Sequence, residues 1–255
     1  MSSSERYTLT EHLKELRTRI IIILIAVVLC SLIAYLFIDK ILGILTAPGG
    51  KMIFIKPAEA FFARLKISML AGGLISLPVI LYQVWKFVNP GLFKMEKVYL
   101  SFAMIFSYVL FLAGAAFAFY FVLPVGVKFL LGMGTQNIQP LISVSSYIDF
   151  LMIFIFAFGL IFQLPLVILV LAKMGIVSPK GLAKSRKYVL VGVFVLGAIF
   201  TPDVFSQFMM AMSTYLLFEI SVFFSRFVYK EKQGKTGTSR LPAVTKTRKK
   251  HNNKI

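Results

Sequence analysis

Long apolar stretches constrain this chain more than any other feature, beginning with the run 20–34, which contains no charged residue. The hydrocarbon core of a bilayer takes a helix of about 20 apolar residues. Six stretches approach that length, and we expect helices over residues 20–38, 62–84, 99–123, 147–171, 188–201 and 204–224. The composition agrees, with 58% hydrophobic and 15% charged residues, whereas soluble domains are about one quarter charged. The sequence predicts an all-α polytopic membrane protein with six transmembrane helices.

The last two predicted helices have little chain available. Only 38 residues, 188–225, must cross twice and turn at 201–203. This leaves about 17 residues, or roughly 25 Å, for each helix, while the hydrocarbon core is about 30 Å thick. We therefore expect short fifth and sixth helices. Either the bilayer thins around them or longer neighbours cover a tucked hairpin.

The distribution of basic residues predicts the orientation. Of the 28 Lys and Arg residues, 22 lie in the segments 1–19, 85–98, 172–187 and 225–255, which belong to one face of a six-helix topology. Lys and Arg concentrate in cytoplasmic segments. Both termini are therefore expected in the cytoplasm. The protein itself is expected to be a multi-pass component of the inner (cytoplasmic) cell membrane.

Three segments of different character follow from this pattern. Residues 1–19 are expected to form a cytoplasmic amphipathic helix, residues 20–226 the transmembrane domain, and residues 227–255 a basic, disordered cytoplasmic tail. Such a tail is attracted to anionic lipids, and nucleic-acid binding is not needed to explain it.

Catalytic chemistry has little support in this sequence. The chain has one cysteine, Cys30, inside the first apolar run, and two histidines, His12 and His251. Neither a zinc site nor a Cys–His nucleophile fits such dispersed residues. We expect no catalytic residue, metal or cofactor, and we do not expect an enzyme. A small secondary transporter or channel is the alternative class, although such proteins usually carry ionisable residues near the midplane.

A carboxylate, Glu15, stands among basic residues at the entry to the first apolar run. Thr8 and Glu11 have capping-box spacing, so a helix can begin there. Apolar residues recur on one face of that helix at Leu9, Leu13, Leu16 and Ile20. Glu15 lies off this face. It can form an i,i+4 ion pair with Arg19, or it can receive a cation from outside the chain.

A second carboxylate, Glu96, lies in the loop after the second predicted helix. The Asn-Pro-Gly at 89–91 is a strong turn signal, and Phe87 supplies an aromatic side chain nearby. Glu96 could pair with Lys94 or Lys97 or support the next helix. Two carboxylates with aromatics on one face would also suit a ligand with both cations and an apolar stretch, and arginine matches carboxylates bidentately.

Several motifs resemble one family along most of the chain. They are HLKELRTR (12–19), PVILYQVW (78–85) followed by Phe87 and Glu96, Ser178-Pro179 followed by RKYVLVG (186–192), TPDVFSQ (201–207) and FEISVFFSR (218–226). In order and spacing they are similar to TatC, the multispanning subunit of the twin-arginine protein translocase. The resemblance covers residues 9–229 and implies six helices with cytoplasmic ends, in agreement with the independent charge count.

The resemblance also implies function. It implies a receptor and core subunit that binds the twin-arginine signal peptides of folded proteins in an oligomeric complex with TatA- and TatB-type single-span subunits, powered by the proton-motive force. Glu15 and Glu96 would read the arginines. Leu16, Arg17 and Phe87 would shape that surface. Pro48 matches a turn tied to export, and Phe200 and Gln207 match the side that meets the single-span partners.

Two intramembrane polar residues qualify the resemblance. Many family members carry a glutamate where this chain has Gln163, and an amide cannot titrate. A buried amide should instead point at protein or trapped water. Glu219 is the remaining candidate intramembrane acid, with interhelical hydrogen bonding as the alternative to a working role.

Overall fold

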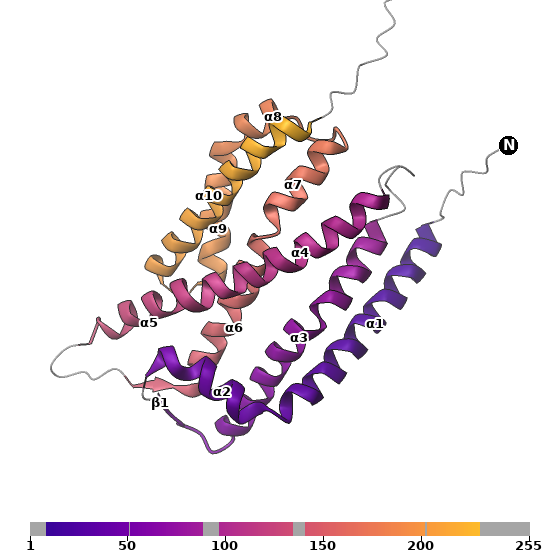
Figure 1. The fold of residues 1–255 in the computed structure, drawn as a ribbon. Helices are drawn as coiled ribbons and strands as arrows, with labels where there is room; N and C mark the ends of the chain where they lie inside the picture. Colours follow the sequence, from indigo (N-terminus) through magenta and orange to yellow (C-terminus); the bar gives the residue numbers. More distant parts are fainter. Residues whose placement is uncertain (1–8, 51, 89–96, 135–140, 202, 230–255) are drawn as a thin grey trace, which may run out of the picture.

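The computed structural model describes residues 9–50, 52–88, 97–134, 141–201 and 203–229. Helices make up nearly all of this part of the chain (Figure 1). The elements are α1 (Leu9–Tyr35), α2 (Ile38–Thr46), η1 (Ala47–Gly49), β1 (Met52–Ile53), α3 (Glu59–Val88), α4 (Lys97–Phe117), the π-helical segment η4 (Ala118–Val122), α5 (Leu123–Leu131), β2 (Ile142–Ser143), α6 (Val144–Ile161), α7 (Leu164–Lys173), α8 (Pro179–Lys184), α9 (Arg186–Phe200) and α10 (Val204–Val228).

Five segments of the described chain are long and apolar enough to cross a membrane: Leu13–Tyr35, Glu59–Phe87, Ala103–Leu131, Val144–Lys173 and Val204–Val228. They correspond to five of the six predicted spans. The other prediction corresponds to α9, whose 15 residues measure about 22 Å. The prediction of a polytopic membrane protein is therefore supported by five candidate spans, one fewer than predicted.

The prediction of a short sixth helix is wrong. Helix α10 has 25 residues and a length of about 37 Å. The Asp203 side chain accepts from the backbone N–H of Ser206 at 2.7 Å and caps the helix start. At the other end no glycine or proline stops the helix at 224, so it continues through 225–228. Only α9 is short.

Helix α1 passes through residues 19 and 20 without interruption. The segment before the apolar run contains Leu, Glu, Lys and Arg, which favour helix, and no glycine or proline. The helix ends at Tyr35, three residues before the predicted end, and α2 follows after a short turn. The functional division of the chain at residue 19 stays a prediction, as does the nature of the tail, which lies almost entirely outside the described residues.

Helices α1 and α3 lie side by side as an antiparallel pair (Figure 1). Gly72 makes their close approach possible, because a Cβ at that position would overlap the backbone and hydroxyl of Ser31. Helix α1 is peripheral. Only 11% of the most apolar part of its candidate span is buried against the rest of the chain, compared with 39% for α3.

Two predicted spans are each built from more than one helix. The third runs from α4 through η4 into α5, with Pro124 at the start of α5. The fourth breaks between α6 and α7, at Phe162 and Gln163, immediately before Pro165. Proline has no N–H for the helix ladder and clashes with the preceding turn. The single continuous helix predicted over 147–171 is therefore two consecutive helices.

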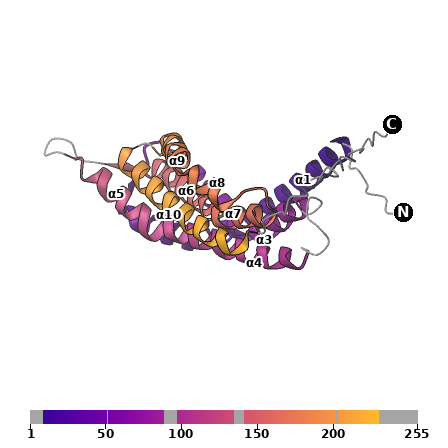
Figure 2. The same ribbon diagram turned by 90° about the horizontal axis from the view of Figure 1, so that it is seen from above.

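Two buried apolar clusters form most of the core. The first lies between α3 and α6, where Ile67 and Leu70 meet Ile148 and Leu151, and it extends to α2 and α5. The second lies where η4 meets α6. Phe154 and Phe158 of α6 are almost fully buried there with Ala118 and Val122 of η4. Helices α7, α8, α9 and α10 form the far side of the molecule. Seen from above, the helices make a thin, curved layer with α1 at one edge (Figure 2).

The two ends of this layer differ in structure. One end carries the beginning of α1, the end of α3, the beginning of α4, α8 and the end of α10 (Figure 1). The opposite end carries α2, α5 and a two-stranded parallel sheet, in which β1 pairs with β2 through Met52–Ile142 and Ile53–Ser143.

Candidate functional site

Arg19 is the centre of a polar cluster where α1 meets α3. Its side chain is buried, with the residue only 7% exposed. The guanidinium donates to the backbone carbonyl of Gln83 at 2.9 Å and forms an ion pair with the Glu15 carboxylate. Its central carbon also lies 5.8 Å from the centroid of the Phe87 ring. A carboxylate, a carbonyl and an aromatic face therefore hold one guanidinium.

The two helices bring these groups together by simple periodicity. Glu15 precedes Arg19 by four residues on α1, and Gln83 precedes Phe87 by four on α3, so each pair lies on one face of its helix. Because α1 and α3 pack closely, Arg19 can reach both. The Glu15–Arg19 ion pair predicted from spacing is confirmed.

The structure brings together only some of the residues that the sequence predicted for binding a signal peptide. Glu15 and Leu16 are half-buried on α1, and Arg17 is exposed on the same turn. Phe87 approaches Glu15 through Arg19, which was predicted only as an ion-pair partner of Glu15. Glu96 lies outside the described residues.

Gln163 lies at the break between α6 and α7 and pairs with Ser107 of α4. The Ser107 hydroxyl donates to the Gln163 side-chain oxygen at 2.5 Å, and the Gln163 amide donates to the Ser107 carbonyl at 2.9 Å. Ser107 is only 2% exposed. The amide thus has protein partners for both its donor and its acceptor, as expected for a polar group at this depth.

Glu219 of α10 forms an ion pair with Arg186, the first residue of α9. The nitrogen–oxygen distances are 2.7 Å from Nε and 2.8 Å from one terminal nitrogen. The side chains are 32% and 44% exposed for Glu219 and Arg186 respectively. Glu219 is therefore an interhelical contact that fixes the beginning of α9 against α10.

At the opposite end, Gln207 links α9 and α10. Its side-chain amide donates to the Phe194 carbonyl at 2.8 Å. A shallow apolar cavity of about 350 Å³ lies beside it, lined by Leu190, Val191, Phe194, Val195, Ala198 and Gln207. Phe200 is the last residue of α9, and its side chain lies outside the described part of the structure.

Pro48 lies in η1, the turn after α2, and is half-buried. Next to it, Gly49 packs so closely against Met52 and the ring of Tyr147 that a Cβ there would overlap them. The Tyr147 hydroxyl donates to the Leu45 carbonyl at 2.8 Å. The turn is therefore fixed on the beginning of α6.

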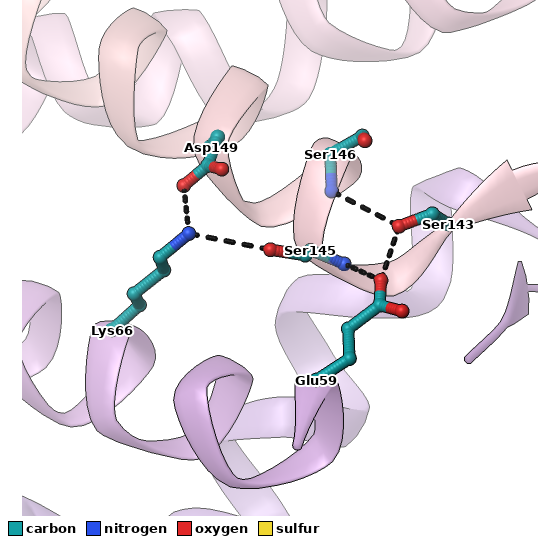
Figure 3. Close-up of polar contacts among 6 residues, drawn as sticks. All are labelled: Glu59, Lys66, Ser143, Ser145, Ser146 and Asp149. Carbon is teal, nitrogen blue, oxygen red and sulfur yellow. Dashed lines mark hydrogen bonds and ion pairs between the residues drawn. The ribbon is translucent and has the colours of Figure 1, made fainter. Parts of the chain in front are cut away.

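Sequence reasoning missed a polar network at this same end, centred on Glu59 (Figure 3). The residue is 7% exposed. One carboxylate oxygen accepts from the Ser143 hydroxyl and from the Ser145 N–H at 2.8 Å; the other accepts from the N–H groups of Ile55 and Lys56 at 2.6 and 3.2 Å. The carboxylate joins the loop before α3 to the beginning of α6.

Lys66 of α3 lies beside the network and contacts Ser145 and Asp149 (Figure 3). Its ammonium group lies 2.6 Å from Asp149 and 3.3 Å from the Ser145 hydroxyl. A cavity of about 610 Å³ opens beside Glu59 and Lys66. One sequence signal pointed here, since Glu59 is the only acid between Asp39 and Glu96. Within the described residues, no group of three His, Cys, Asp or Glu side chains could hold a metal ion.

Comparisons with known proteins agree on one family. The model of the family Sec-independent protein translocase protein (TatC) matches residues 11–212. The TatC of Carboxydothermus hydrogenoformans is 43% identical over 87% of this chain and 93% of its own length. The TatC of Escherichia coli is 41% identical over 89% of this chain and 91% of its own.

A solved structure supports the same relationship. The crystal structure described as the twin-arginine translocase receptor TatC superposes with a TM-score of 0.77 at 42% sequence identity, covering 86% of this chain and 99% of that one. The matches extend over most of the chain in both sequence and fold. The chain belongs to the TatC family of Sec-independent protein translocase proteins.

Proposed function

We propose that this chain is the receptor and core subunit of a twin-arginine translocase, and that it binds the signal peptides of folded proteins. One observation carries the proposal: near the beginning of α1, the Glu15 carboxylate already holds a guanidinium over an aromatic ring. The relative with the same fold is described as the twin-arginine translocase receptor. A signal arginine needs the same partners that Arg19 uses.

The recognition surface would combine Glu15 and Phe87 with Leu16, Arg17 and Glu96. Guanidinium–carboxylate hydrogen bonds are charge-assisted and bidentate, so they discriminate arginine from lysine. Much of their energy offsets the desolvation of the charges. The carboxylates therefore provide specificity, and the apolar segment of the signal provides affinity. Glu96 enters this proposal from the sequence alone.

The binding surface would face the cytoplasm, with both termini on that side and α9 as the sixth crossing. Two observations support this orientation. The beginnings of α1 and α4, the end of α3, α8 and the end of α10 gather at one end (Figure 1). In the sequence, the segments 1–19, 85–98, 172–187 and 225–255 hold 22 of the 28 Lys and Arg residues, as expected of cytoplasmic segments.

The single-span TatA- and TatB-type subunits would bind at α9 and α10, near Phe200 and Gln207. The exposed apolar cavity beside Gln207 supports this position, because an apolar helix could fill it. Pro48 would hold the outer turn needed for export. The chain would act in an oligomeric complex driven by the proton-motive force. Anionic lipids would bind the basic tail, and neither nucleic acid nor catalysis would be involved.

Site-specific photo-crosslinking tests the signal-binding surface. A photoreactive residue at position 15 or 96 should crosslink a twin-arginine precursor. Crosslinking should fall when the precursor carries two lysines, because the other carboxylate of the pair is still present to favour arginine. Lys40, on α2 at the opposite end, is the control position. Crosslinks from position 40 that are as strong as those from 15 and 96, or lysine precursors that crosslink equally well, would reject the assignment.

A further inference from the structure

A second polar cavity lies away from Glu15, between α8 and the end of α10. It has a volume of about 610 Å³ and is lined by Ser178, Pro179, Lys180, Ala183, Arg226 and Tyr229. Helix α8 is held in place because Leu182 packs against the apolar cluster of Ile168, Phe218 and Val222. The cavity is thus formed by two elements that are fixed against each other.

The charged residues that line this cavity are cationic in the part of the chain that the structure describes. Lys180 and Arg226 contribute two cations, and no Asp or Glu of the described ranges lines it. Neither cation has an ion-pair partner within the part of the chain that the structure describes. Ser178 and Tyr229 add hydroxyl groups. Two cations with hydroxyl donors are the groups that bind phosphate.

The cavity lies at the level where a bilayer presents its headgroups. Arg226 is in the last turn of α10, whose candidate membrane span ends at Val228. Tyr229 follows directly, and tyrosines concentrate at membrane interfaces. A ligand here would meet the bilayer surface on one side and α8 on the other.

An apolar ridge of three exposed aromatic side chains lies on α10 within one turn of Arg226. Phe223, Phe224 and Phe227 are 55%, 51% and 75% exposed. The Phe223 ring packs edge-on against Phe227, with centroids 5.4 Å apart. Exposed aromatic side chains at this depth can contact acyl chains. A soluble phosphate would use only the cavity, whereas a phospholipid would use both the cavity and the ridge.

We propose that this cavity binds the phosphate group of an anionic phospholipid, with the acyl chains lying along the Phe223–Phe227 ridge. The lipid would be a bound structural ligand between α8 and α10 in the leaflet at this end of the molecule. The site is separate from the Glu15 surface, and the proposal does not depend on signal-peptide binding.

The test uses the purified full chain in detergent, titrated with labelled phosphatidylglycerol. Replacing both cations in Lys180→Gln/Arg226→Gln should weaken binding about fivefold for each charge removed. The matched control is Lys14→Gln/Lys86→Gln, which removes two exposed cations at the same end of the molecule, on α1 and α3, and none from the cavity lining. Its affinity should stay within about twofold of the unchanged chain, because exposed distant charges are screened.

A second variant separates the cavity from its charge. Ala183→Phe keeps both cations but fills the cavity, so it should also lose phosphatidylglycerol. Circular dichroism shows that each variant retains its helices. Equal losses in the two charge pairs, or undiminished binding by Ala183→Phe, would overturn the site. Displacement of the labelled lipid by glycerol 3-phosphate, at the concentration at which unlabelled phosphatidylglycerol displaces it, would overturn its assignment to a lipid.

Discussion

Arg19 shows, at the level of one side chain, what the beginning of α1 can hold. It is buried with a carboxylate, a carbonyl and an aromatic ring as partners. A signal arginine that reaches Glu15 must share the carboxylate with Arg19 or displace it. Either way, we expect Glu15 to contribute to the discrimination between arginine and lysine.

Glu15→Ala should weaken the binding of a twin-arginine peptide about tenfold or more. Hydrogen bonds to charged groups contribute about 1.5–3 kcal/mol, and 1.4 kcal/mol is about tenfold in affinity. Binding of a fluorescent peptide to the purified chain measures this. The control is Thr18→Ala, because the Thr18 hydroxyl bonds only to the Lys14 carbonyl of its own helix.

A double-mutant cycle identifies the group that Glu15 reads. The penalty for replacing the peptide arginines by lysines should shrink in Glu15→Ala, since the carboxylate that favours the guanidinium is gone. An unchanged lysine penalty would show that another group reads the arginines. Membrane insertion of the variant should be normal, because the residue lies before the apolar run.

At the level of helix packing, two adjacent glycines of α3 differ in whether an added methyl group would fit. Gly72 and Gly73 are neighbours on α3 and both are buried. A Cβ on Gly72 would overlap the backbone of Ser31, whereas a Cβ on Gly73 would meet the Phe156 ring at an ordinary 3.8 Å. The two glycines therefore predict opposite outcomes.

Gly72→Ala should destabilise the chain by about 1–3 kcal/mol, because overpacking forces α1 away from α3. Gly73→Ala should be neutral or slightly stabilising, since alanine favours helix. Denaturant unfolding of the helical circular dichroism signal measures both. Similar unfolding free energies for the two variants would contradict the α1–α3 contact. Arg19 of α1 bonds to the Gln83 carbonyl of α3. Because this contact depends on the packing of the two helices, Gly72→Ala should also weaken peptide binding.

The Glu59 network makes a prediction about the loop before α3. Glu59→Gln replaces an acceptor-only carboxylate by an amide that carries donors, so it cannot satisfy all four N–H and O–H groups around it. The loop 50–58 should open more often and be cleaved several-fold faster by protease added to that side. Asp149→Asn is the control, because its pair with Lys66 is half-exposed and contributes little. Equal cleavage rates would contradict the network.

The helices and contacts that could be predicted are those determined by residues close together in the sequence. The apolar runs predicted the spans, and the i,i+4 spacing predicted the Glu15–Arg19 pair. The break before Pro165 was missed because the apolar run continues across it. The Glu59 network could not be read from sequence, since its donors come from residues 55, 56, 143 and 145. Contacts between distant segments need the fold.

At the level of the whole molecule, the helices that form the thin curved layer (Figure 2) differ in length. Helix α1 at one edge supplies a candidate span of 23 residues, about 34 Å long. Helix α9 has only 15 residues, about 22 Å. The hydrocarbon core is about 30 Å thick, so α1 is long enough to cross it whereas α9 is too short. Its exposed Val191, Val195 and Ile199 still require an apolar environment.

This difference predicts local thinning of the bilayer. Lipid beside α9 should be several ångströms thinner than lipid beside α1, because thinning costs a fraction of a kcal/mol per ångström and exposing apolar side chains costs more. Electron microscopy of the chain in a lipid nanodisc measures thickness on both sides. Inserting four leucines after Leu190 adds one helical turn and should reduce the difference. Equal thickness beside α1 and α9 in the unaltered chain would show that α9 does not thin the bilayer and is covered in another way.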